Sequence, residues 1–106
     1  MSTAPTGTAK SLGDAHGKVT DEQGFVDWIG EATLYEVHPP LNGFPKVVAS
    51  TVQDAPRFST SGAQYGVETL LFGVSADNIQ NSEELPYGGW GDTAEQALTE
   101  AGYRVV

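Results

Sequence analysis

Apolar and polar positions alternate with a period of two in three stretches of the chain, which predicts three β-strands. Residues 32–38 alternate between two sets of side chains rich in β-branched and aromatic residues. Residues 46–53 are rich in valine, and residues 66–74 become apolar on both faces, which is typical of a central, covered strand. Pro39-Pro40 ends the first strand, and residues 41–45 form a loop around Asn42-Gly43, a pair that tolerates positive φ. We therefore expect an antiparallel hairpin there.

A short helix is expected near the N-terminus. Residues 20–23, Thr-Asp-Glu-Gln, have the form of a capping box. Phe25, Trp28 and Ile29 follow at helical spacing and share one face. Gly30 suits a left-handed end to this helix.

A clearer helix is expected close to the C-terminus. Asp92 or Thr93 caps its start, and Glu95 or Gln96 closes the capping box. Its compact apolar face consists of Ala94, Ala97, Leu98 and Ala101. Gly102 ends it. Residues 103–106 then predict a short final strand that can join the edge of the sheet.

Together these elements predict an α+β fold. Its small antiparallel sheet has three to four strands and is packed by the C-terminal helix, with the short N-terminal helix beside it. Residues 1–19 are rich in Ser, Thr, Gly and Ala and hold few apolar groups, so they predict a flexible N-terminal arm. Residues 20–106 form a single domain, in which residues 54–65 and 75–91 are polar, turn-rich loops.

The net charge of the chain indicates which class of macromolecule it can bind. The net charge is −9, with +1 on residues 1–20, −4 on residues 21–58 and −6 on residues 59–106. Direct binding to nucleic acid or to an anionic membrane needs clustered Lys and Arg, which this sequence lacks. A protein partner with a basic surface is favoured instead. The chain has no cysteine and shows no signal peptide or membrane-spanning run, so we expect a cytoplasmic protein.

The sequence holds no constellation of residues that indicates catalysis. His16 and His38 are too few for a zinc site, and residues 77–84 lack the spacing of a calcium loop. Residues 88–91, Gly-Gly-Trp-Gly, match neither dinucleotide nor P-loop spacing, and no serine lies in a nucleophile elbow. We therefore expect no enzymatic activity, no metal and no cofactor.

Loop aromatic and acidic residues are the candidates for contact with a partner. Tyr and Trp bury a large area at small entropic cost and are favoured as interface anchors. The predicted contact residues are Phe58, Glu83, Glu84, Tyr87 and Trp90. For Tyr87 and Trp90 the alternative is packing over the sheet edge. Tyr65, with Phe58, is a possible anchor of the loop 54–65.

Several short stretches resemble, in order and spacing, small uncharacterised proteins encoded by phages of actinobacteria, of the mycobacteriophage type. The stretches are residues 35–41 (YEVHPPL), 47–50 (VVAS), 68–72 (ETLLF), 84–86 (ELP) and 97–106 (ALTEAGYRVV). The resemblance covers residues 34–106, and no activity comes with it. The tryptophan that such proteins carry shortly before the Glu-Leu-Pro stretch is missing from residues 78–83.

These observations favour a phage-type accessory protein that acts by binding a host or phage protein, in the bacterial cytoplasm. Its expected contact region is the loop 75–91, with Tyr87 and Trp90. One alternative is a virion decoration or assembly component, in which residues 1–30 grip a neighbour. Another is an acidic mimic of nucleic acid, which only the charge of −9 suggests.

Overall fold

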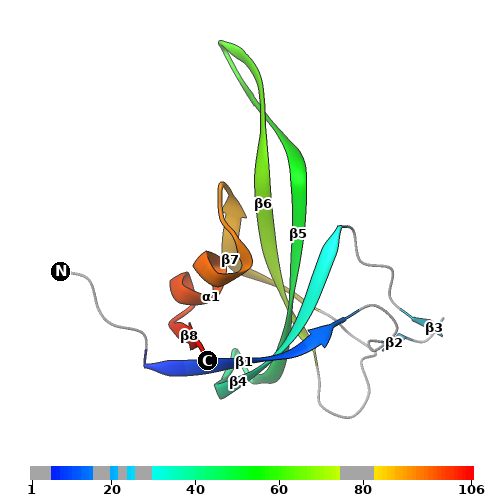
Figure 1. Cartoon of the computed structure of the whole chain (residues 1–106), viewed down its shortest axis with the longest axis vertical. Helices are drawn as coiled ribbons and strands as arrows, with labels where there is room; N and C mark the ends of the chain where they lie inside the picture. Colours follow the sequence, from blue (N-terminus) through cyan, green and yellow to red (C-terminus); the bar gives the residue numbers. More distant parts are fainter. Residues whose placement is uncertain (1–5, 16–19, 22–23, 26–29, 75–82) are drawn as a thin grey trace.

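A computed structural model describes residues 6–15, 20–21, 24–25, 30–74 and 83–106, and most of these lie in β-strands (Figure 1). The elements in chain order are β1 (Gly7–Asp14), β2 (Thr20–Asp21), β3 (Gly24–Phe25), β4 (Glu31–Leu41), β5 (Phe44–Ser59), β6 (Gly62–Val74), β7 (Glu83–Trp90), α1 (Ala94–Glu100) and β8 (Tyr103–Val105). Six strands form one sheet in the order β7-β6-β5-β4-β1-β8, and β2 pairs with β3. The sheet is mixed, because β1 and β8 run parallel while its other neighbours are antiparallel.

The expected α+β fold with a sheet of three to four antiparallel strands is therefore wrong. The main sheet has six strands, and α1 is the one helix in the described part of the chain. Where the short N-terminal helix was expected, Thr20–Asp21 and Gly24–Phe25 pair as strands. Trp28 and Ile29 lie outside the described residues. A helix of about ten residues is marginal without tertiary packing, and Gly24 lowers its propensity further.

The predicted hairpin is confirmed, but the expected end of its first strand at Pro39-Pro40 is wrong, because β4 continues to Leu41 and β5 begins at Phe44. β4 and β5 pair antiparallel, and Leu41 pairs with Phe44 across the turn Asn42-Gly43. Both turn residues have positive φ, 49° for Asn42 and 86° for Gly43. This is the type I′ geometry that fits the twist of the two strands.

The N-terminal region differs from expectation, because Gly7–Asp14 form β1 inside the sheet rather than part of a flexible arm. β1 pairs with β4 on one side and with β8 on the other. The strand is held by backbone pairing and by small residues: Ala9 is fully buried, and a Cβ on Gly7 would lie 2.6 Å from the Tyr103 ring. Residues 7–14 therefore form a strand although they contain few large apolar side chains.

α1 begins and ends as predicted. Thr93 is its N-cap, with its hydroxyl accepting from the Gln96 amide, while the Gln96 side chain accepts from the Thr93 amide at 2.8 Å. Ala97 and Leu98 are fully buried. Gly102 follows the helix with φ 99°, and β8 then joins the sheet edge as expected.

The sheet curls around α1. The helix contacts β5, β6, β7 and β8, and thus reaches both edge strands of the sheet. Seven helical residues span only about 10 Å, whereas six flat strands would set the edges about 24 Å apart. The curl brings the residues of the main core together on the helix side: Ala9, Tyr35, Val37, Leu41, Val47, Ala49, Leu71, Leu85, Ala97, Leu98 and Tyr103. A second cluster, which includes Leu34, Val48 and Val74, is buried separately.

Candidate protein-binding surface

β5 and β6 continue past the rest of the sheet as a two-stranded ribbon (Figure 1). The pairing of β4 with β5 ends at Glu31 and Thr51, and that of β6 with β7 ends at Glu68 and Trp90. Beyond these points β5 and β6 pair only with each other, over residues 55–66. We call this segment the hairpin extension. Residues 54–65 were expected to form a loop, and that expectation is wrong.

The tip of the hairpin extension is a tight turn. Ser59 pairs with Gly62, and Thr60 and Ser61 form the connection. The Ser59 hydroxyl accepts from the Ser61 amide at 3.3 Å and lies 2.9 Å from the Ser61 hydroxyl. Gly62 has φ 117°, a conformation that disfavours a side chain. The serines and glycine that suggested a loop therefore form the reversal between two longer strands.

One face of the hairpin extension is apolar and uncovered. Pro56 pairs with Tyr65, and Phe58 pairs with Ala63. Paired residues lie on the same face of an antiparallel ribbon, and residues two apart share that face. These four side chains form what we call the aromatic face. Phe58 is 76% exposed and Tyr65 is 68% exposed.

The opposite face of the hairpin extension is braced by Trp90 at the end of β7. The Trp90 indole Nε1 donates a hydrogen bond to the Ala55 carbonyl at 3.0 Å. The indole ring lies against Gly66, where a Cβ would lie 2.9 Å from it. The Arg57 guanidinium stands over the same ring, 5.1 Å from its centroid. These contacts hold the base of the extension against the body of the protein.

Some of the contact residues expected from sequence are exposed in the structure, and others are half-buried. Phe58 is exposed on the aromatic face, and Glu84 is exposed on β7. Tyr87 is half-buried against the main core, and Trp90 is half-buried under the extension. For these two residues, packing was the alternative that the sequence left open. Glu83 lies at the start of β7, and its side chain is outside the description.

Tyr65 was absent from the predicted contact residues and completes the aromatic face. The available signal was the spacing of Pro56-Arg-Phe58 and Ala63-Gln-Tyr65 on either side of residues 59–62, Ser-Thr-Ser-Gly. Both flanks place their apolar residues two apart, as a strand with one apolar face requires. Sequence reasoning missed the signal because the turn-forming residues between the flanks favoured a loop.

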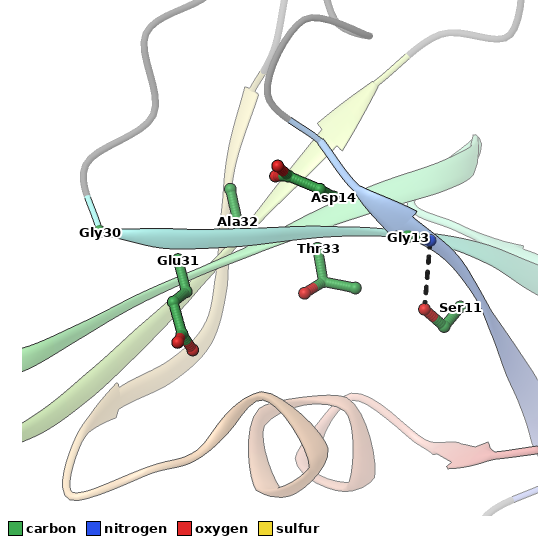
Figure 2. A pocket seen from close by; sticks show the side chains of 7 residues that line it. All are labelled: Ser11, Gly13, Asp14, Gly30, Glu31, Ala32 and Thr33. Atoms are coloured by element: carbon green, nitrogen blue, oxygen red, sulfur yellow. Dashed lines mark hydrogen bonds between the residues drawn. The ribbon is translucent and has the colours of Figure 1, made fainter.

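A surface hollow of about 450 Å³ lies between β1 and β4, lined by Ser11, Gly13, Asp14, Gly30, Glu31, Ala32 and Thr33. Figure 2 shows Glu31 and Thr33 on the side of β4 that faces α1, while Asp14 and Ala32 point to the other side. Ser11 accepts a hydrogen bond from the Gly13 amide at 3.2 Å. The two carboxylates thus do not converge, and the hollow has no arrangement typical of acid–base catalysis.

The described residues also contain no group of three or more His, Asp or Glu side chains that could hold a metal ion.

The His38 ring lies 2.9 Å from the Glu36 carboxylate, and the His38 side chain is 69% exposed to solvent. The hydrogen bond from His38, and then the nearby Lys10 and Lys46, lower the pKa of Glu36. Lys10, Glu36 and Lys46 are neighbours in one cross-strand row of β1, β4 and β5. This row is a partly exposed charge ladder that stabilises the carboxylate form of Glu36.

Two tyrosines of the main core have altered acidity. Burial, followed by the negative charge of Glu95, raises the pKa of Tyr35. Burial, followed by the proximity of Tyr87, raises the pKa of Tyr103, whose hydroxyl donates to the Pro39 carbonyl. A raised pKa keeps both phenols neutral. Tyr35 therefore acts as a packing group, and Tyr103 packs and donates a hydrogen bond.

Comparison with known proteins gives no relative. No family model, no curated protein and no solved structure matches this chain. Within the described part of the chain, no helix has the length and apolar character needed to cross a membrane.

Proposed function

We propose that this protein acts by binding another protein chain, as a phage-type accessory protein, and that the aromatic face is its contact surface. One observation carries the proposal: Phe58 and Tyr65 are 76% and 68% exposed on the same face of a braced hairpin. Large aromatic side chains are more often buried than left in water. Two of them at diagonal positions on one face of a projecting ribbon favour a surface that a partner covers.

The bracing by Trp90 makes this face better suited to binding than a loop. A loop loses conformational entropy when a partner orders it, and that loss weakens association. The hairpin extension is already paired over residues 55–66, and Trp90 and Arg57 pack on its other side. Phe58 and Tyr65 are thus presented on a backbone that is already in place. Aromatic anchors of this kind dominate the energy of many interfaces.

The part of the molecule outside the hairpin extension, which we call the acidic body, indicates the charge of a partner. Glu84 on β7 and Glu95 and Glu100 on α1 are exposed. Complementary charge accelerates encounter and selects partners. We therefore propose that a host or phage partner that contacts the body presents a basic surface. A virion assembly role remains the second candidate, favoured by the projection of the hairpin extension from the sheet (Figure 1).

Photo-crosslinking from the aromatic face tests the proposal. A photoreactive phenylalanine analogue replaces Phe58 in one protein and Gln64 in a matched control, since Gln64 is paired in the same ribbon but lies on its opposite face. Each protein is irradiated in lysate from an actinobacterial host, with and without phage infection. The expected result is a discrete crosslinked product from position 58 that position 64 does not give.

Competition identifies specific crosslinks. Excess unlabelled wild-type protein is expected to abolish the product, and excess Phe58→Ser/Tyr65→Ser protein is expected to leave it. Identical products from positions 58 and 64, or equal competition by both proteins, would refute the aromatic face as the contact surface. A product of twice 11.2 kDa identifies the partner as a second copy, and any other mass identifies a different protein.

A further inference from the structure

The aromatic face differs in charge from the rest of the molecule. Arg57 is the one charged residue between positions 55 and 66, so the remaining chain carries −10 against −9 for the whole. Arg57 stands over the Trp90 ring, on the opposite face of the ribbon. The aromatic face itself, made of Pro56, Phe58, Ala63 and Tyr65, therefore carries no formal charge. A basic partner gains attraction from the body and none from this face.

We propose that the aromatic face binds the aromatic face of a second copy of this chain, forming a weak symmetric dimer. The inference rests on the proposed use of this face in protein binding and names its partner. In a twofold dimer the same patch is used by both copies, so the patch must be self-complementary. An uncharged apolar ribbon meets that condition, whereas the acidic body does not.

An antiparallel arrangement of the two extensions keeps the acidic bodies apart. The five residues Ala55 to Ser59 of β5 span about 17 Å as a strand. At physiological ionic strength charges are screened over about 8 Å. Two bodies at opposite ends of paired extensions are thus separated by more than this screening length. The apolar faces meet while the repulsion between the bodies is largely screened.

The area of the aromatic face indicates how stable the proposed dimer is. Aromatic side chains bury about 150–250 Å² each in an interface core. At the exposures of Phe58 and Tyr65, these two contribute on the order of 200–300 Å² per copy, and Pro56 and Ala63 add less. A stable interface buries about 800 Å² per partner. The expected dimer is therefore weak and reversible.

Sedimentation of the full chain tests the proposal over protein concentrations from about 10 μM to about 1 mM. The mean mass is expected to rise from 11.2 kDa toward twice that value. Between about 0.01 M and about 1 M NaCl the Debye length falls from ~30 Å to ~3 Å, so salt is expected to increase the dimer fraction. Binding of a basic partner to the acidic body responds in the opposite direction, because salt screens that attraction.

Two variants locate the interface. Phe58→Ser/Tyr65→Ser is expected to remain monomeric at every concentration, while Gln64→Ser, on the opposite face, is expected to dimerise like the parent. Both exchange only exposed residues, so the fold is expected to persist. A parent that stays monomeric in high salt at about 1 mM, or a dimer that the double variant retains, overturns the proposal.

Disulfide trapping gives a second measurement. The chain has no cysteine, so one introduced thiol is unique. Ala63→Cys, on the aromatic face, is expected to form an intermolecular disulfide several-fold faster than Gln64→Cys. Equal rates count against the interface. A monomeric parent whose position 58 still crosslinks to a different protein rejects only the second copy, whereas loss of both results also rejects the proposed function.

Discussion

Trp90→Phe tests whether the hairpin extension is held in place by the brace at its base. The substitution retains an aromatic ring and removes the Nε1 donor that bonds the Ala55 carbonyl at 3.0 Å. A hydrogen bond of this kind contributes about 0.5–1.5 kcal/mol net. The contact with Arg57, 5.1 Å from the ring centroid, weakens as well, because Trp is the best partner for a cation and such contacts contribute about 0.5–1 kcal/mol at exposed sites.

The expected loss is therefore about 1–2 kcal/mol of unfolding free energy. This loss lowers Tm by roughly 5–10 °C in a domain of this size. It also speeds hydrogen exchange of protected amides in residues 55–66 by about 5- to 30-fold. Urea unfolding followed by circular dichroism gives the first quantity, and exchange measured by mass spectrometry or NMR gives the last.

The matched control is Phe58→Ser, which changes the exposed face of the same ribbon. Its unfolding free energy is expected to stay within about 0.5 kcal/mol of the parent. If Trp90→Phe leaves both the stability and the exchange of the hairpin extension unchanged, Trp90 does not brace it. If Phe58→Ser destabilises as much as Trp90→Phe, the aromatic face is part of the packing and not a contact surface.

Three further predictions concern the packing of the core and the charge of Glu36. Gly7→Ala is expected to cost about 1–3 kcal/mol in urea unfolding, because its Cβ would lie 2.6 Å from a buried tyrosine ring; wild-type stability would contradict the placement of β1. Thr69→Val removes one partner of the buried 2.9 Å hydroxyl pair with Thr51, so a loss of about 1–2 kcal/mol is expected, and adding Thr51→Val should recover most of it. Because the pKa of Glu36 is lowered on folding, its carboxylate favours the folded state above the ordinary pKa of glutamate, and this contribution is lost as pH falls through the lowered value. NMR titration should give a midpoint for Glu36 that His38→Ala moves upward, and an unmoved midpoint would exclude the hydrogen bond as the main cause.

The aromatic face and the acidic body are expected to respond to salt in opposite directions. The proposed attraction between the acidic body and a basic partner is expected to weaken as salt is added. The uncharged aromatic face brings together two copies that repel each other elsewhere, and salt relieves the repulsion. A protein with both surfaces can hold a second copy and a basic partner at the same time, which is the arrangement that an assembly component needs.

The aromatic face could be predicted only in part from the sequence. Phe58 lies in a stretch that the sequence predicts as a loop, where an aromatic residue is a candidate for contact with a partner, and the structure leaves it exposed. Tyr87 and Trp90 have the same signal but pack against the core and the extension. The difference lies in what surrounds each ring in space. No property of the local sequence distinguishes a covered aromatic residue from an uncovered one.

Elements that depend on nearby residues were determined by the sequence itself. The Asn42-Gly43 turn follows from the tolerance of these two residues for positive φ, and the start of α1 follows from Thr93 and Gln96, three positions apart. Each is stabilised within a few residues, so a short window of sequence contains the whole cause.

Only the tertiary structure decided the rest. β1 is a strand because β4 and β8 offer it backbone partners on both sides, and Gly7 pairs with Tyr103 from the other end of the chain. The strands of the hairpin extension are paired although the aromatic face is largely exposed to solvent. Trp90, at the end of β7, supports the opposite face. Every residue type except proline has both a backbone donor and a backbone acceptor, so strand order and strand length beyond the core leave little trace in the pattern of side chains.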